Sequence, residues 1–325
     1  MATSDKTALV IGATGSLGGE AAAALLARGW RVRGLHRDPV RAAREVVGLE
    51  RIDWVKGDAM SAADVTAAAQ GAAVIVHGAN PPGYRNWAGL AVPMLEATIA
   101  AAKATGARIL FPGNVYNYGP DAFPMMAEDA PQNPTTRKGA IRVAMERRLA
   151  SAGVRTIVVR AGDFFGPVSG SSWLTEGIVA KDKPLRSVSY PGPRNIRHAW
   201  AYLPDLAETM ARLAEIEATL PDYATYQFGG HQLTGDEMIS GLERVARRRL
   251  AVKGFPWLAL RAVAPFIETL REMLEMRYLW DKAVLLDNAR LVKTLGAEPH
   301  TPLETALKTA LQGQGCLSMD QKAAA

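Results

Sequence analysis

A strand, turn and helix pattern near the N-terminus constrains the fold of this chain more than any other feature. Apolar residues 8–11 predict a short buried strand, and glycines follow at positions 12, 15 and 18. The alanine- and leucine-rich run 20–27 then predicts a helix that Gly29 ends. Glycines at this spacing permit a sharp turn, let the backbone approach a pyrophosphate, and let the helix pack on the strand. The helix N-terminus would add free N–H groups and partial positive charge for phosphates. The alternative interpretation is an ordinary tight turn between a strand and a helix.

The same alternation continues through the first half of the chain. Further strands are expected at 31–35, 52–55, 73–77, 108–111 and 154–160, with helices between them that include 87–105 and 135–150. The strand at 154–160 is almost wholly apolar and β-branched, as a central parallel strand should be. This order predicts an α/β fold, a doubly wound parallel (Rossmann) sheet that forms a dinucleotide-binding domain over residues 1–167. Ligands of such a sheet lie beyond the carboxyl ends of its strands.

The pattern loosens after Arg160. Helices are expected at 171–180, 204–220, 234–250 and 256–280, and short strands at 187–190, 198–202 and 225–228. Residues 168–312 are therefore predicted to form a smaller, mainly helical substrate lobe, with part of the chain returning to the sheet. The low-complexity end, 313–325, is predicted to be a disordered tail.

Composition and charge exclude several classes of protein. The chain is 48% hydrophobic and 22% charged with a net charge of +6, and its charges are scattered instead of forming a basic stripe, so nucleic acid is not expected as a partner. The single cysteine, Cys316, excludes a disulfide within the chain and fits a reducing cytoplasm. The apolar run 255–267 is too short to span a bilayer and is broken by prolines, so no membrane association is expected. The histidines lack metal-ligand spacing, so no metal is expected either.

The turns that follow the first four strands are candidates for cofactor contacts. His36 and Arg37 follow the second strand, where a basic residue favours the 2′-phosphate of NADP over the free ribose of NAD; a solvated loop charge is the alternative for Arg37. Asp58 either accepts from an adenine amino group or caps the helix that starts near Ser61. The residues expected to contact the cofactor are Gly12, Thr14, Gly15, Ser16, Leu17, Gly18, His36, Arg37, Asp58, Ala59, Gly78, Ala79 and Asn80.

Five segments together resemble an extended short-chain dehydrogenase/reductase, the group that includes NAD-dependent epimerases and dehydratases. They are GATGSLGGE at 12–20, Gly57-Asp58, VIVHGAN at 74–80, VYNYGP at 115–120 and VVRAGDFFGP at 158–167. Together they cover about half of the chain in matching order. The resemblance implies an NAD(P)-dependent oxidoreductase-like protein that acts at a carbonyl or alcohol carbon of a small molecule.

The chain departs from this family at the catalytic positions. The resemblance implies a Ser/Thr, a Tyr and a Lys four residues after the Tyr, where the Lys lowers the pKa of a proton-donating phenol. The serine position holds Asn114, and counting back eight and four residues from Glu146 places Lys138 and Arg142 at the Tyr and Lys positions.

Alternatives for the chemistry of this site stay open. In an enzyme, Lys138 would donate the proton, its pKa lowered by Arg142 and burial, and Asn114 would hold a carbonyl oxygen. A tyrosine from another direction, Tyr84, Tyr116 or Tyr118, is a second source of the proton. The third interpretation is a catalytically silent sensor or interaction protein that binds NADP. Related proteins often form homodimers through the helices after the fourth and fifth strands, so a homodimer is a further expectation.

Overall fold

A seven-stranded parallel sheet forms the centre of the molecule. The computed structural model describes residues 6–46, 48–81, 86–168, 170 and 172–317. All neighbouring strands of this sheet are parallel, in the order β11-β7-β5-β4-β1-β2-β3. The strands are β1 (Thr7–Ile11), β2 (Arg31–His36), β3 (Asp53–Lys56), β4 (Val74–His77), β5 (Arg108–Asn114), β7 (Thr156–Ala161) and β11 (Tyr223–Phe228). The predicted α/β fold with a doubly wound parallel sheet is confirmed.

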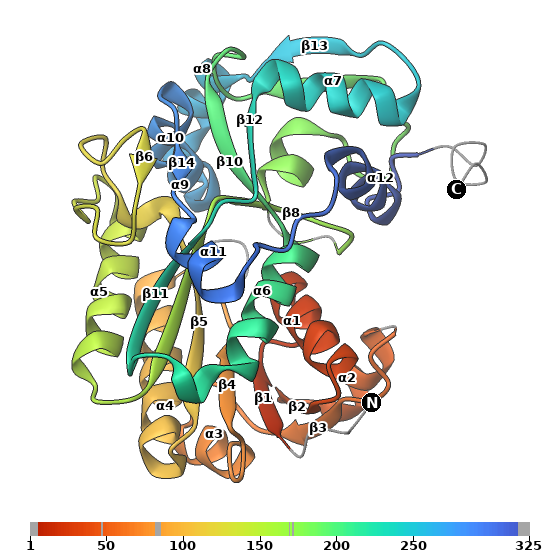
Figure 1. Cartoon of the computed structure of the whole chain (residues 1–325). Coiled ribbons are helices and arrows are strands. Elements are labelled where there is room, and N and C mark those ends of the chain that lie inside the picture. Colours follow the sequence, from red (N-terminus) through yellow and green to blue (C-terminus); the bar gives the residue numbers. More distant parts are fainter. Residues whose placement is uncertain (1–5, 47, 82–85, 169, 171, 318–325) are drawn as a thin grey trace.

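Helices cover both faces of this sheet (Figure 1). One apolar core joins the sheet to α1 (Ser16–Ala27), α6 (Leu203–Glu215) and α11 (Ala289–Leu295). The core on the other face contains side chains of α3 (Ala62–Ala68), α4 (Trp87–Thr105) and α5 (Arg137–Ser151). Strand residues alternate between the two cores: Val10 contributes to the first, and its neighbours Leu9 and Ile11 to the second. Burial on both faces explains why these strands are continuous apolar runs.

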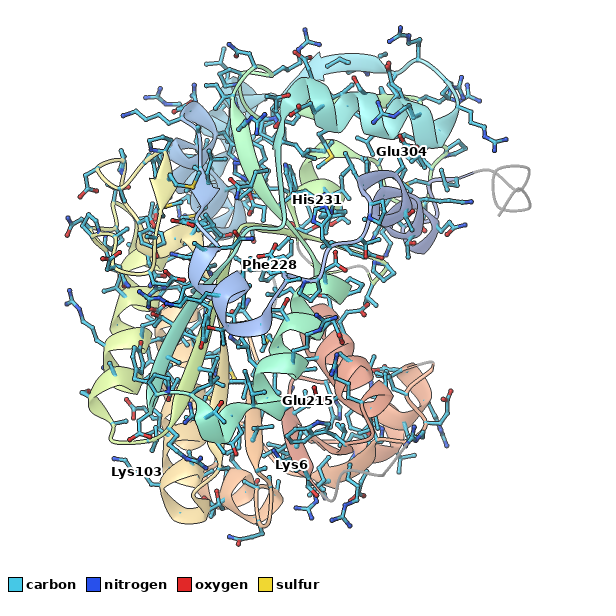
Figure 2. All side chains as sticks on the ribbon, in the orientation of Figure 1. Lys6, Lys103, Glu215, Phe228, His231 and Glu304 are labelled. Carbon is cyan, nitrogen blue, oxygen red and sulfur yellow. The ribbon has the colours of Figure 1, made fainter. Side chains whose placement is uncertain are left out.

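Polar contacts fasten α1 to α6 on the first face. Arg28, just after α1, pairs with Glu208 and Glu215 of α6. Lys6, ahead of β1, donates to the backbone carbonyl of Glu215 at 3.3 Å, and Figure 2 shows these two residues near the lower edge of the sheet. The chain that returns from the second half is therefore bound to the N-terminal part of the sheet domain as well as adding β11 to the sheet.

A second layer of structure lies beyond the carboxyl ends of the strands (Figure 1). It contains three small sheets: β8 (Asp163–Phe165) with β10 (Arg197–Tyr202) and β12 (His231–Thr234); β9 (Ser187–Tyr190) with β13 (Ala251–Gly254); and β6 (Met125–Met126) with β14 (Leu285–Leu286). Its helices are α7 (Gly235–Ala246), α8 (Trp257–Val263), α9 (Glu268–Glu275), α10 (Tyr278–Asp281) and α12 (Leu303–Gly313). The remaining helix of the described chain, α2 (Pro39–Glu45), follows β2. A third apolar core, rich in aromatic side chains, fills this lobe.

Three segments of the lobe differ from the sequence predictions. The expected helix 256–280 is divided into α8, a 3-10 turn at Ala264–Phe266, α9 and α10, because Pro265 cannot continue the helical hydrogen bonds. The expected helix 171–180 is reduced to a π-helical turn at Leu174–Ile178. Residues 313–317 of the expected tail are packed in place: Gln314 is fully buried and Cys316 donates its backbone N–H to Leu311 at 2.9 Å. The rest of that tail, 318–325, lies outside the described residues.

The described helices include none that is both long and apolar enough to cross a membrane.

Candidate functional site

The turn after β1 is packed so closely that only glycine fits at positions 12 and 18. Gly12 has a positive φ of 85°, and a Cβ added there would lie 2.8 Å from the backbone carbon of Gly78, just after β4. A Cβ on Gly18 would lie 2.1 Å from the carbonyl oxygen of Gly12. Two of the predicted cofactor segments, 12–18 and 78–80, therefore meet at the carboxyl edge of the sheet. Here an approaching ligand finds backbone instead of side chains.

Helix α1 begins at this turn, and no side chain of the described residues caps its N-terminus. Gly15 is the N-cap residue in extended conformation, and the first turn carries no acidic residue. Thr14 and Gly15 are exposed, Ser16 is half-buried, and Leu17 packs into the core. The backbone of Gly170 approaches Ser16 from the lobe, since a Cβ there would lie 2.7 Å from the Ser16 hydroxyl. Uncapped N–H groups and the helix dipole make this a suitable place for an anionic group such as a phosphate.

The end of β2 presents basic side chains. Arg37 is exposed and His36 half-buried. Asp38, which follows them, is the N-cap of α2: its carboxylate accepts from the backbone N–H of Arg41 at 3.0 Å. The acidic group at this strand end is therefore engaged with its own helix.

The Asp58 carboxylate shapes the turn after β3. Its Oδ1 accepts from the backbone N–H of Met60 at 2.9 Å, while Ser61 is the N-cap of α3 and accepts from the N–H of Asp64. Capping of this helix, one of the two roles considered for Asp58, thus belongs to Ser61. Half-buried Ala59 packs against the core beneath.

Lys138 and Arg142 lie together at the start of α5, beside the end of β5. Both cationic groups lie 5.6 Å from the centre of the Trp87 ring. Arg142 also donates to the backbone carbonyl of Pro112 at 3.1 Å. Asn114, the last residue of β5, accepts from the backbone N–H of Tyr116 through its Oδ1 at 3.0 Å. The fold thus gathers the three residues that the resemblance implied at one place on the carboxyl edge of the sheet.

A carboxylate from the lobe joins this group, and no sequence pattern predicted it. Glu272 of α9 is 7% exposed, and its Oε2 lies 3.1 Å from the Nζ of Lys138. Arg137 contacts Glu272 at 3.3 Å and Glu275 at 3.1 Å, so that two acids of α9 face two cations of α5. The sequence had suggested mutual repulsion of Lys138 and Arg142 as the main electrostatic influence. An opposite charge at this distance instead favours the ammonium form.

A cavity opens between α5, α9 and the π-helical turn. Its lining residues are Tyr116, Lys138, Ser172, Trp173, Glu176, Glu272, Met273 and Met276. The cavity has Lys138 on one wall and an aromatic and thioether surface on the others, and its volume of about 20 Å³ is roughly the space of one water molecule.

The three tyrosines considered as alternative proton donors differ in position. Tyr116 lines the cavity. The hydroxyl of Tyr118 accepts from Arg160 at 2.9 Å and from Gln227 at 2.5 Å, and burial raises the pKa of this phenol. Tyr118 is therefore part of a closed internal network. Tyr84 lies outside the described residues.

Buried polar residues behind the site are structural. His77, at the end of β4, contacts the hydroxyl of Thr98 through Nδ1 at 2.8 Å, and burial together with the charge of Arg142 lowers the pKa of His77 to about 3. Arg160 pairs with Glu146 at 2.7 Å. Asp163 is nearer to Arg160 in the sequence, but its carboxylate contacts His198. Within the described ranges, no group of three or more His, Cys, Asp or Glu side chains could hold a metal ion.

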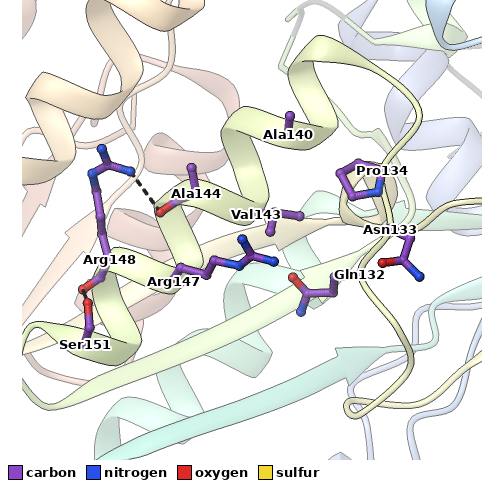
Figure 3. Close-up of a pocket in the computed structure, with 9 residues that line it drawn as sticks. All are labelled: Gln132, Asn133, Pro134, Ala140, Val143, Ala144, Arg147, Arg148 and Ser151. Atoms are coloured by element: carbon purple, nitrogen blue, oxygen red, sulfur yellow. Dashed lines mark hydrogen bonds between the residues drawn. The ribbon is translucent and has the colours of Figure 1, made fainter.

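A second hollow, of about 690 Å³, lies on the outer side of α5. Figure 3 shows Arg147 extending from the helix toward Gln132, while Arg148 turns back and donates to the carbonyl of Ala144 at 3.3 Å. Arg148 also pairs with Glu96 of α4 at 2.8 Å. This polar surface joins the two helices that follow β4 and β5.

Comparison with known sequences identifies the family. Residues 8–229 match the NAD dependent epimerase/dehydratase family. The chain belongs to this family. The match includes the glycine turn, almost the whole of the seven-stranded sheet and the positions of Asn114, Lys138 and Arg142.

Among curated relatives of this epimerase/dehydratase family member is a 3-diazoavenalumate denitrifying reductase of a Streptomyces species, 32% identical over 180 residues. The alignment spans 50% of this chain and 57% of the relative's length. Solved structures share the fold. A UDP-glucose 4-epimerase of Stenotrophomonas maltophila, with bound NAD and formylated UDP-arabinopyranose, has a TM-score of 0.74 at 16% identity and covers 99% of this chain and 100% of its own. A UDP-glucose 4-epimerase of Bifidobacterium longum in complex with NAD⁺ and UDP has a TM-score of 0.71 at 17% identity. The match covers 95% of this chain and 98% of the epimerase.

Proposed function

We propose that this protein is an NAD(P)-dependent oxidoreductase that acts at a carbonyl or alcohol carbon of a small molecule. One observation supports this most strongly: the glycine turn of β1, the close contact with Gly78 and the uncapped start of α1 adjoin Asn114 and Lys138 along one sheet edge. A dinucleotide whose pyrophosphate lay on α1 would extend past β4 toward the end of β5. A bound nicotinamide would supply or accept the hydride.

The residues near the end of β5 have separate roles in proton transfer and in stabilising the substrate oxygen. Lys138 donates a proton to the developing alkoxide, or removes one from an alcohol, in place of a phenol. Asn114 donates an amide hydrogen to the same oxygen, and Arg142 adds positive charge next to Trp87. Glu272 orients the ammonium of Lys138 toward the cavity.

We infer a preference for NADP. Arg37 is exposed at the end of β2, while Asp38 is bound to the start of α2. A guanidinium there binds a 2′-phosphate, whereas an acidic group free to accept from both ribose hydroxyls would favour NAD.

We also infer a homodimer of this protein in the cytoplasm. Helices α4 and α5 lie side by side, joined by Arg148 and Glu96, and the hollow beside Arg147 gives this face a polar surface. A second copy would need complementary acidic groups, and sedimentation of the purified protein at several concentrations tests this association.

A second candidate reaction follows from the ion pair between Lys138 and Glu272. A lysine held by a carboxylate is a poorer acid than the phenol it replaces, which suits a hydride acceptor that needs no proton. The Streptomyces relative is named for removing nitrogen from a diazo compound. In a diazonium reduction, hydride forms the new C–H bond and the C–N bond breaks. Its electron pair leaves with N₂, so no acid is required.

One experiment tests the proposal. NADPH and NADH are titrated into wild type and Lys138→Ala by nucleotide fluorescence, and nicotinamide absorbance is followed with a panel of carbonyl and aryl diazonium compounds. We expect both proteins to bind dinucleotide and only wild type to reduce carbonyls. Retained diazonium reduction by Lys138→Ala would favour the second reaction. Tight binding without turnover of any substrate would favour a silent sensor, and no binding at all would refute the proposal.

A further inference from the structure

Helix α8 contains no buried residue, although its sequence, WLALRAV, is almost wholly apolar. Leu258 is 85% exposed, and Phe266, in the 3-10 turn that follows the helix, is 86% exposed. Val263 and Ile267 are each 45% exposed. We call these four side chains the α8 surface. Adjoining apolar side chains left in water over such a short segment mark a contact with a protein or a membrane.

The segment that carries the α8 surface is attached firmly to the lobe. Trp257, the first residue of α8, donates its indole N–H to the carbonyl of Pro191 at 2.8 Å. In the 3-10 turn, Ala264 is buried, and Arg271 donates to the carbonyl of Pro265 at 2.9 Å. The exposed side chains are therefore presented by a fixed segment, with its apolar anchors on one side and the α8 surface on the other.

The chain around this surface is basic. Residues 244–267 contain five arginines and one lysine, and no Asp or Glu. Two of these arginines pair with acids of α7 and α12. The other four cations, Arg247, Arg248, Lys253 and Arg261, are exposed and form no ion pair within the part of the chain that the structure describes. Their positive charge is thus available to an acidic partner.

The basic and apolar residues lie along one edge of the lobe. Figure 1 shows β13 at this upper edge, with the end of α7 leading into the strand and α8 following it. Two residues, Phe255 and Pro256, separate β13 from α8. All four residues of β13 are exposed, and the strand pairs with β9 alone. The edge lies at the opposite end of the molecule from β3 and α3.

This combination of charge and shape favours a lipid surface over a protein. A second copy docked about a two-fold axis would bring the same unpaired cations face to face, and like charges repel. An acidic protein would need a fitted pocket for each projecting side chain, Leu258 and Phe266. The boundary between lipid headgroups and acyl chains accepts such side chains without a preformed pocket, and anionic headgroups attract Lys and Arg.

We propose that the α8 surface docks on an anionic membrane surface. Leu258, Phe266 and Ile267 enter the boundary between headgroups and acyl chains, and Lys253 and Arg261 face the lipid phosphates. The run 255–267 is too short to cross a bilayer, which is why the sequence did not lead us to expect membrane association. Contact with one leaflet needs only the exposed side chains of this run.

Vesicle binding tests the proposal without turnover. The full chain is sedimented with vesicles of phosphatidylcholine, or of phosphatidylcholine and phosphatidylserine in equal amounts, at low and high salt. We expect about tenfold or more higher affinity for the anionic vesicles, and a decrease of that affinity as salt screens the charges. Equal affinity for both vesicles, or no binding to either, would overturn the proposal.

A double variant tests the apolar contact. Leu258→Ser/Phe266→Ser should lower the affinity for anionic vesicles about tenfold or more, because both side chains leave water only on docking. Val40→Ser is the control, since Val40 is an apolar residue of α2 that is 62% exposed. Unchanged affinity in the double variant would refute the docking role. Self-association without vesicles that the double variant abolishes would instead assign the surface to a second copy.

A second double variant tests the charge. Lys253→Gln/Arg261→Gln should lower the affinity for anionic vesicles about tenfold and reduce its dependence on salt. Arg44→Gln/Arg51→Gln removes the same total charge at two exposed arginines outside the lobe and should change the affinity much less. Equal losses in the two charge variants would show that net charge, and not the α8 edge, attracts the membrane, and would overturn the assignment.

Discussion

Glu272 of α9 and Lys138 of α5 form a buried ion pair, with the carboxylate oxygen 3.1 Å from the ammonium nitrogen and both side chains less than a tenth exposed. The pair connects the lobe to the sheet domain at Lys138, the residue proposed above as the proton donor. Two charges removed from water stabilise each other only as long as both are present. The stability of the molecule and the arrangement of its proposed site therefore depend on the same contact.

Glu272→Gln should destabilise the protein more than an exposed charge change does. Loss of one partner from a buried pair costs about 3 kcal/mol, whereas Glu45→Gln, in the exposed pair with Arg41, should cost less than about 1 kcal/mol. Urea unfolding followed by circular dichroism measures both. The double variant Lys138→Met/Glu272→Leu should recover part of the loss, because it leaves no uncompensated charge. Equal unfolding free energies for Glu272→Gln and Glu45→Gln would show that the pair contributes nothing.

Gly18→Ala should abolish dinucleotide binding. The new Cβ would lie 2.1 Å from the carbonyl oxygen of Gly12, so the backbone of the turn proposed to bind the pyrophosphate has to move. Gly254→Ala is the control, because nothing lies within 4 Å of a Cβ at that position. The affinity for NADPH, read from its fluorescence, should fall at least tenfold in the first variant and stay unchanged in the second. A folded Gly18→Ala protein with wild-type affinity would contradict the assignment of this turn.

The elements that could be predicted from sequence are those set by local spacing. The glycines at 12, 15 and 18 and the apolar runs around β1, β4 and β7 require only neighbours along the chain to define a parallel sheet, and the structure has that sheet. The positions of Asn114, Lys138 and Arg142 followed from counting along a family pattern, and the fold brings them together at the end of β5. Their chemical roles stay a prediction.

Contacts between segments far apart in the chain could not be predicted from the sequence. Glu272 lies in residues 256–280, which the sequence pattern predicts as one long helix. No feature of that segment indicates that Glu272 pairs with Lys138. The break at Pro265 turns α9 toward α5, and only this tertiary arrangement buries the carboxylate. The same reason explains Gln314 and Cys316: a low-complexity end looks mobile in sequence, but here it fills a space beside α12.

Arg37→Ala should change cofactor preference. Removal of an exposed guanidinium at the end of β2 should lower the affinity for NADPH about tenfold and leave the affinity for NADH nearly unchanged. The reason is that a charge-assisted contact to the 2′-phosphate contributes about 1.5 kcal/mol to binding. Arg44→Ala, in the last turn of α2, removes the same charge away from the strand end and serves as the control. Separate titrations with NADPH and NADH give the ratio of the two affinities for each variant. An equal loss of affinity for NADPH and NADH would mean that Arg37 does not bind the 2′-phosphate.

His77 should make the folded protein less stable as the pH falls. Burial and Arg142 lower its pKa from 6.5 to about 3, so between these values the unfolded chain binds a proton that the folded chain does not. The stabilisation is complete above pH 6.5 and is lost as the pH decreases, by about 2 kcal/mol at pH 5. His77→Gln should therefore lose less stability than wild type between pH 7.5 and pH 5, as measured by urea unfolding at each pH. Changes at carboxylates and at His231, whose pKa burial also lowers, to about 4, are common to both proteins and cancel in the difference. Parallel pH curves for the two proteins would show that His77 takes up its proton equally in the folded and unfolded states.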